Sequence, residues 1–271
     1  MKRELEILVL SDIHLGTYGC RARALNQYLR SVNPKMIILN GDIIDIWQFK
    51  KSYFPKQHMQ VIRKLLKFAK HIPVYYITGN HDEALRKYSG HTFGNLHLVD
   101  KLVLTVDDKK YWFFHGDIFD ATMKCAKWLA KLGAIGYDTL IIINSFVNWF
   151  LEKLGRERMS FSKKIKNSVK KAVSYISEFE QTAADIAIEQ KYDYVVCGHI
   201  HQPEMRPIIG QKGKVIYMNS GDWIENLSAL EYSQGQWKIH YFNEKASESL
   251  QNDTEDDEQL MPEELLASIL S

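Results

Sequence analysis

The stretch ITGNHDE, residues 77–83, closes an apolar run and places Asn80, His81 and Asp82 directly behind it. The residues at 74–77, VYYI, are β-branched and aromatic, which is typical of a buried strand. Gly79 allows the chain to turn sharply off the end of that strand. A buried strand that ends in three polar side chains indicates a functional site at its tip.

Four other apolar runs end in the same way. They lead into SDIHLG (11–16), NGDIID (40–45), FHGD (114–117) and CGHIH (197–201). Because ligands of α/β sheets bind beyond the carboxyl ends of the strands, these five polar clusters predict one shared site.

The composition is that of an ordinary globular protein. The chain has 271 residues, 45% of them hydrophobic and 25% charged. Its net charge of +2 argues neither for nor against a nucleic-acid partner, and no such partner is expected. Its three cysteines are widely spaced, which excludes a disulfide framework or a zinc ribbon and suits the cytoplasm. The first apolar run is too short for a signal sequence, and the run around 139–150 is too polar to span a bilayer.

The pattern of apolar residues predicts an α/β fold. Buried strands are expected at 5–10, 36–39, 74–77, 111–114, 194–196 and 215–218, with helices at 22–31 and 57–71. Residues 227–232 and 236–242, joined through Gln234 and Gly235, predict a hairpin. The late hairpin indicates a second sheet.

Three regions are predicted along the chain: a core at 1–120 and 190–243, a helical insertion at 121–189, and an acidic, disordered tail at 244–271. The insertion is apolar around Trp128, Phe146, Trp149 and Phe150, and basic after residue 152. This favours a lid that contacts an anionic membrane surface or an acylated substrate. A solvated helix pair is the alternative.

Seven side chains in the strand-end clusters are predicted metal ligands. They are Asp12, His14, Asp42, Asn80, His115, His199 and His201. Oxygen and imidazole donors without a thiolate favour Mn, Fe or Zn. Seven ligands are too many for one tetrahedral ion, so two metals are expected, with Asp42 as the natural bridging carboxylate.

The series D-x-H, G-D-x-x-D, G-N-H-D, H-G-D and G-H-x-H between residues 10 and 222 resembles the calcineurin-like metallophosphoesterases. The resemblance implies a four-layered αββα sandwich. It implies one metal held by Asp12, His14, Asp42 and His201, and a second held by Asp42, Asn80, His115 and His199. It also implies that Asp45 supports the site from behind the ligands, although Asp45 in this sequence also suits the cap of a following helix.

His81 is the predicted catalytic side chain beside ligand Asn80. By its position it hydrogen-bonds the phosphate or protonates the leaving oxygen, with Asp82 orienting it. The remaining histidines fall outside every motif and are assigned no role; they are His58, His71, His91, His97 and His240.

Within the superfamily, the chain resembles the UDP-2,3-diacylglucosamine diphosphatases. The shared features are DIHLG, GDxx(D/E)xW at 41–47, an insertion directly after HGD, and GHxHxP at 198–203. The resemblance implies cleavage of a pyrophosphate to UMP and lipid X in lipid A synthesis, a lid over acyl chains, manganese, and a peripheral position on the cytoplasmic face of the inner membrane. Asp120, Lys164 and Lys171 are the expected substrate contacts, together with Asn80 and His81.

One difference leaves the substrate open. The chain has GNHD at 79–82 where the best-known members of the group have GNRD. A hydrolase on the same scaffold, acting on other nucleotides, phosphodiesters or phospholipid precursors, is therefore an alternative. A non-catalytic binding scaffold is a second alternative, against which the intact ligand set argues.

Overall fold

The computed structural model describes residues 2–47, 54–119 and 161–244, with the side chains of 161–172 excepted. Met1–Tyr241 form one compact unit, and the fold below is that of this unit. Among the described residues, no helix is both long enough and apolar enough to cross a membrane.

The first sheet has seven strands and carries three of the five polar clusters. In spatial order it consists of β14 (Gln236–Tyr241), β13 (Ser228–Ser233), β2 (Ile7–Leu10), β4 (Ile37–Asn40), β5 (Val74–Ile77), β7 (Leu96–Val99) and β6 (Thr92–Phe93). Strands β2, β4, β5 and β7 run parallel, and every residue of β2 and β4 is buried. The sequence of such strands is continuously apolar because both faces are covered.

The second sheet has five strands and carries the other two clusters. Its order is β11 (Glu204–Gly210), β12 (Gly213–Asn219), β10 (Tyr194–Cys197), β9 (Lys109–Phe113) and β8 (Leu102–Val106). Strands β9, β10 and β12 run parallel, while β8 and β11 pair antiparallel at the edges. A separate pair of strands, β1 (Arg3–Leu5) and β3 (Val32–Pro34), lies outside the two sheets, and two short 3-10 helices, η1 (Glu83–Tyr88) and η2 (Asp117–Phe119), follow β5 and β9.

Two apolar cores define the layers, and neighbouring residues of β10 show how. Val196 points into the core between the two sheets, with Val9 and Ile38 of the first sheet. Val195 points the other way, into a core shared with Phe179 of helix α5 (Phe161–Glu189). Successive side chains of a strand face opposite sides, so one strand serves both cores.

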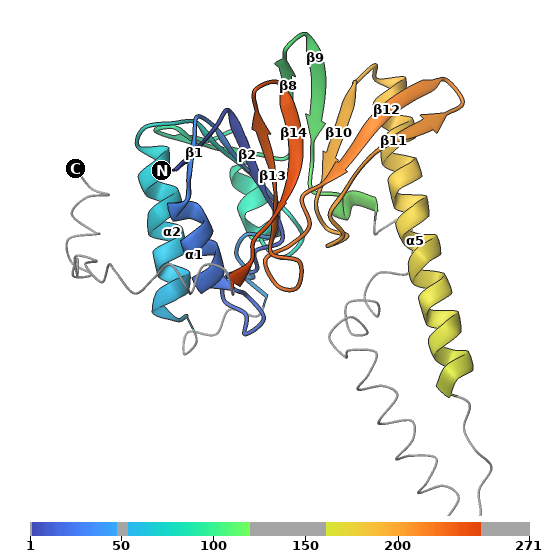
Figure 1. Cartoon of the computed structure of the whole chain (residues 1–271), viewed down its shortest axis with the longest axis horizontal. Coiled ribbons are helices and arrows are strands. Elements are labelled where there is room, and N and C mark those ends of the chain that lie inside the picture. Colours follow the sequence, from blue (N-terminus) through green and yellow to red (C-terminus); the bar gives the residue numbers. More distant parts are fainter. Residues whose placement is uncertain (1, 48–53, 120–160, 245–271) are drawn as a thin grey trace, which may run out of the picture. The chain divides into compact units, whose positions relative to one another are not determined.

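Helices cover the outer faces, which completes an αββα sandwich. Helices α1 (Ala22–Arg30) and α2 (Lys56–Ala69) cover the seven-stranded sheet, and α5 covers the five-stranded one (Figure 1). The predicted α/β class, the presence of two sheets and the hairpin β13–β14 are confirmed. Contrary to expectation, the hairpin does not belong to the second sheet, because β13 pairs with β2 and extends the first sheet.

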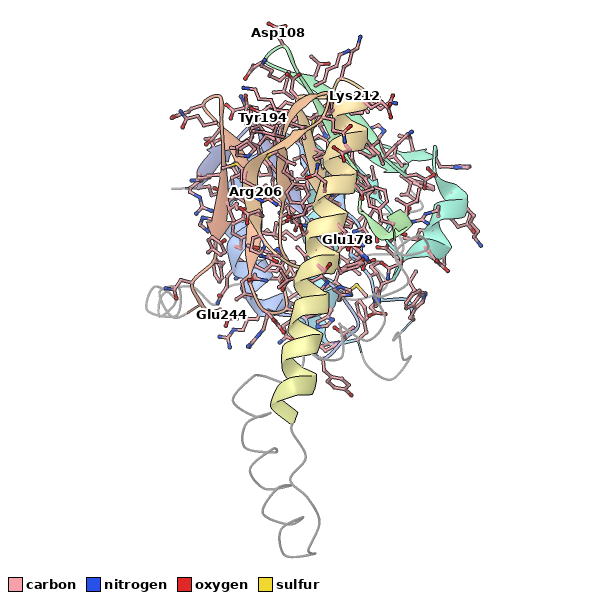
Figure 2. All side chains as sticks on the ribbon, turned by 90° about the vertical axis from the view of Figure 1, so that its right-hand side faces the viewer. Asp108, Glu178, Tyr194, Arg206, Lys212 and Glu244 are labelled. Carbon is pink, nitrogen blue, oxygen red and sulfur yellow. The ribbon has the colours of Figure 1, made fainter. Side chains whose placement is uncertain are left out.

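The C-terminal part of α5 packs on the core, although the sequence assigned it to the insertion at 121–189. Phe179, Ala183 and Ala187 recur every fourth residue and are fully buried against the second sheet. Ion pairs from Arg206 to Glu180, and from Lys212 to Glu189 at 3.0 Å, fasten the helix to the β11–β12 hairpin (Figure 2). This part of the predicted insertion at 121–189 is therefore a layer of the core. Residues 120–160 and the predicted tail from residue 245 lie outside the described residues.

Candidate metal centre

Five loops bring the predicted ligands to one edge of the two sheets. Asp12 and His14 follow β2, Asp42 follows β4 and Asn80 follows β5; His115 follows β9, and the pair His199 and His201 follows β10. Left-handed backbone is common to five of them, with φ of 51° at Asp12, 53° at His14, 55° at Asp42, 67° at His199 and 56° at His201. Non-glycine residues adopt this conformation at a cost of roughly 1–3 kcal/mol each, and such residues cluster at functional sites.

Two glycines allow the loops to approach closely. A Cβ atom at Gly41, where φ is +86°, would lie 2.3 Å from the ring of His115. A Cβ atom at Gly79 would lie 2.2 Å from Asp42 Oδ1 and 2.8 Å from His115 Cδ2. The glycine of GNHD therefore serves close packing against two predicted ligands, which places Asn80 beside them.

A first group of donors consists of Asp12, His14 and His201, whose potential ligand atoms all lie within 4.8 Å of one another. His201 Nε2 is 3.1 Å from Asp12 Oδ1 and 3.4 Å from His14 Nε2. Burial acts to raise the pKa of the Asp12 carboxyl, but the neighbouring His201 and His115 outweigh it and lower the pKa. The buried carboxylate therefore stays ionised.

A second group consists of Asp42, His115 and His199. His115 Nε2 lies 3.2 Å from Asp42 Oδ2, while its Nδ1 is 2.9 Å from the carbonyl of Asn40. A carbonyl oxygen can only accept a hydrogen bond, so Nδ1 of His115 carries the proton. The lone pair of Nε2 is then available to ligate a cation. Asn80 Oδ1 is buried without a hydrogen-bond partner among the described residues, as expected of an atom that faces a cation.

Asp42 lies between the two groups. Its Oδ2 atom is 3.2 Å from His115 Nε2 in the second group and 3.9 Å from His14 Nε2 in the first. Burial acts to raise the pKa of this carboxyl, but His115, His14 and His81 outweigh it and hold the pKa far below its ordinary value. An ionised carboxylate at this position suits the bridging role predicted from the sequence.

His81 contacts a different carboxylate from the one predicted. Its Nδ1 lies 2.9 Å from Asp45 Oδ2, and the same oxygen is 3.6 Å from His14 Nδ1. Burial acts to lower the pKa of His81, but the hydrogen bond with Asp45 and the charge of Asp42 raise it above its ordinary value. Asp45 is buried and its carboxylate faces the two imidazoles, the position that the predicted supporting role requires.

Asp82 instead organises the loop. Its carboxylate accepts hydrogen bonds from Ile43 N at 2.9 Å, Gly79 N at 2.6 Å and the Tyr76 hydroxyl at 2.6 Å. Burial raises the pKa of this carboxyl. The prediction that Asp82 orients His81 is therefore wrong: Asp45 takes that place, and Asp82 ties the loop after β5 to the loop after β4.

Comparison with known families identifies the family of the chain. The family model for calcineurin-like phosphoesterases matches residues 5–203. The chain belongs to this family.

Individual relatives are distant. A UDP-2,3-diacylglucosamine hydrolase of Shewanella sp. (strain ANA-3) is 24% identical over 238 residues, which are 84% of this chain and 94% of the relative. A DNA double-strand break repair protein Mre11 of Methanococcus maripaludis is 26% identical over 250 residues, 85% of this chain but 60% of the relative. A solved archaeal phosphodiesterase aligns over 87% of this chain and 98% of its own, with 12% identity and a TM-score of 0.42.

The family motifs did not predict several residues that hold the loops in place. His58 of α2 is buried, and its Nδ1 accepts a hydrogen bond from Gly16 N at 2.9 Å, which fastens the loop that carries His14. Asn226, whose side-chain amide also bonds Asp222, donates a hydrogen bond to the carbonyl of His201 and so holds the loop that carries this histidine. A lone histidine in a helix gives no signal of such a role, whereas Asp222 lies in an NSGDW segment whose glycine and polar residues indicate a tight turn.

Three predicted substrate contacts have no described side chain. Asp120 lies outside the described residues, as do the side chains of Lys164 and Lys171 on α5. They stay predictions.

Proposed function

We propose that this phosphoesterase is a two-metal hydrolase that cleaves the pyrophosphate of UDP-2,3-diacylglucosamine or of a closely similar acylated sugar nucleotide. The observation that carries the chemistry is the meeting of two histidine and aspartate groups on either side of Asp42. Such a constellation suits a hydrolase that works by in-line displacement at phosphorus.

The chain's own residues divide between two cations. Asp12, His14 and His201 would hold one, Asn80, His115 and His199 the other, and Asp42 would contact both. Two bound cations would supply positive charge for the phosphoryl oxygens and would lower the pKa of a bound water molecule to near neutrality. Manganese is proposed, and iron or zinc fit the same donors.

His81 is proposed to act on the leaving oxygen. Asp45 occupies its Nδ1 atom, which leaves Nε2 to donate a proton to the substrate. The side chain of His81 is 23% exposed whereas that of Asp45 is 1% exposed, so the imidazole faces the solvent side of the site and the carboxylate lies behind it. The hydrogen bond with Asp45 and the charge of Asp42 raise the pKa of His81, which favours the protonated ring that a general acid requires.

The substrate class has separate support. A curated relative that spans 84% of the chain is named UDP-2,3-diacylglucosamine hydrolase. The predicted lid, the basic run behind it and contact with the cytoplasmic face of an anionic membrane fit an acylated substrate, and they stay proposals because residues 120–160 lie outside the described part of the chain.

The decisive experiment incubates the purified chain with UDP-2,3-diacylglucosamine and Mn²⁺ and measures UMP and the acylated sugar phosphate. Metal-dependent release of both products would support the proposal and show that GNHD serves where relatives carry GNRD. Failure to release UMP, with turnover of bis(p-nitrophenyl) phosphate retained, would keep the two-metal chemistry and exclude this substrate. Failure on both substrates, with metal loaded, would favour a binding scaffold.

A further inference from the structure

The segment NSGDW, residues 219–223, lies beyond residues 5–203 that the family model covers, yet it contacts the metal centre. The backbone amide of Trp223 donates to the carbonyl of Asp12 at 3.1 Å. The hydroxyl of Ser220 lies 2.7 Å from that of Ser11, the residue before Asp12. The segment therefore packs directly behind the loop that supplies the first donor group.

Asp222 is the fully buried carboxylate at the centre of this segment. Its Oδ1 atom accepts hydrogen bonds from the backbone amides of Ile224 at 2.7 Å, Glu225 at 2.6 Å and Asn226 at 3.3 Å. These bonds fold the next four residues into a tight turn. The turn brings the side chain of Asn226 back toward the loop after β10.

The second oxygen of Asp222 begins a chain of contacts that ends at His201. The amide nitrogen of Asn226 donates to Asp222 Oδ2 at 2.6 Å and to the carbonyl oxygen of His201 at 2.7 Å. Asp222 Oδ2 is also 3.9 Å from His201 Nδ1. The side-chain amide of Asn226, held by Asp222, thus restrains the backbone of a predicted ligand, and the Asp222 carboxylate lies on the ring side of the same residue.

His201 needs such restraint more than an ordinary residue does. Its backbone is left-handed, with φ of 56°, and its side chain is 36% exposed, in contrast to the buried His115. A strained and partly exposed residue stays in one conformation only when its surroundings fix it. The side-chain amide of Asn226 donates to the carbonyl of His201 and so helps to hold the backbone of His201 in this left-handed conformation.

We propose that Asp222 and Asn226 are a positioning pair that fixes His201 and thereby sets the affinity of the first donor group for its cation. The proposal rests on the two-metal centre proposed above. Their contacts with the centre, together with that of Trp223, go to Asp12 and His201, which belong to the same group. Loss of the pair therefore weakens one of two cation sites and leaves the other.

The test is a stepwise Mn²⁺ titration of the metal-free chain by calorimetry, in wild type, Asn226→Ala and a control. Groups behind the ligands change metal affinity by about 10–100-fold, so Asn226→Ala is expected to weaken one of the two binding steps at least about tenfold. Asn33→Ala is the matched control, because Asn33 also bonds a carboxylate, that of Glu4 at 2.8 Å, but at the exposed position of strand β3. The control is expected to bind both equivalents like wild type.

Two outcomes overturn the proposal: unchanged binding of both equivalents in Asn226→Ala, or an equal loss in both steps, which marks a general structural defect. If the wild-type chain itself binds Mn²⁺ only weakly in both steps, the proposed metal centre is refuted. Asp222→Asn is the second variant. It keeps an oxygen for the turn amides but presents an amide donor to Asn226, so the link to His201 breaks while the turn remains. It is expected to weaken the same single step.

Discussion

Replacement of Gly79 by alanine tests how tightly the five loops are fitted together. The added Cβ atom would lie 2.2 Å from Asp42 Oδ1, 2.7 Å from the Asp42 backbone nitrogen and 2.8 Å from His115 Cδ2. Ordinary contact begins at 3.4 Å, and all three atoms belong to Asp42 and His115, which are buried. The loop that carries Asn80 and His81 must therefore move by about 1 Å relative to Asp42.

The size of the effect follows from that displacement. A misplacement of about 1 Å in a catalytic constellation costs on the order of a hundredfold in rate. Two factors of ten correspond to about 2.7 kcal/mol of lost transition-state stabilisation. We therefore expect kcat/KM of Gly79→Ala to fall about a hundredfold.

The assay is Mn²⁺-dependent hydrolysis of bis(p-nitrophenyl) phosphate, with circular dichroism to verify the fold. Gly19→Ala is the control, because its Cβ would meet only the Ile224 Cγ2 methyl, at 3.3 Å, and a shift of a few tenths of an ångström relieves that contact. The control is expected to retain wild-type activity. Activity of Gly79→Ala within about threefold of wild type, with the fold intact, would refute the close-packing argument, since a displacement of this size cannot leave the rate unchanged.

Three further perturbations test separate residues. Asp42→Ala is expected to abolish activity and metal content together, because both donor groups lose their shared carboxylate; metal analysis that still finds two equivalents would exclude the bridging role. His81→Ala is expected to lower kcat by about 10²–10⁴-fold while both metals stay bound, and loss of metal in this variant would instead make His81 a ligand. Burial lowers the pKa of His58, so the unfolded chain binds more protons than the folded one as the pH falls through the ordinary histidine range. The stability that neutral His58 provides is therefore present above that range and is lost below it; urea unfolding should show a smaller loss between pH 7 and pH 5 in His58→Gln, and parallel curves would contradict this assignment.

The sequence predicted the position of the site because two features of the sequence indicate each strand end. An apolar run that stops at glycine indicates a sheet edge, and the histidine or aspartate that follows has no packing reason to lie there. Asp42 and His115 were assigned on this pattern, and the structure brings them within 3.2 Å of one another. Five such patterns in one chain exclude coincidence.

Neighbours in sequence were less informative about contacts. Asp82 is adjacent to His81, yet its carboxylate faces the amides of Ile43 and Gly79, and Asp45 from another loop meets the imidazole. Spacing gives the loop to which a side chain belongs but not its direction, which depends on φ and ψ within the turn.

Two of the differences between the predicted and the observed fold have different reasons. Strand β11 was not predicted because its exposed edge position allows the mixed sequence EMRPIIG, with a proline that a central strand would not tolerate. The end of α5 was assigned to the insertion because its alanines carry little hydrophobic signal, although Ala183 and Ala187 pack closely on the sheet. Small side chains bring a helix near a sheet without making its sequence strongly apolar.

The candidate metal centre draws on both sheets. Asp12 and Asp42 extend from the seven-stranded sheet, while His115 and His199 extend from the five-stranded one. A cation held between them acts as a removable cross-link across the middle of the sandwich. At a free concentration a hundredfold above its dissociation constant, each cation adds about 2.7 kcal/mol to the free energy of unfolding. The supply of metal would then govern how long the folded chain survives as well as how fast it turns over.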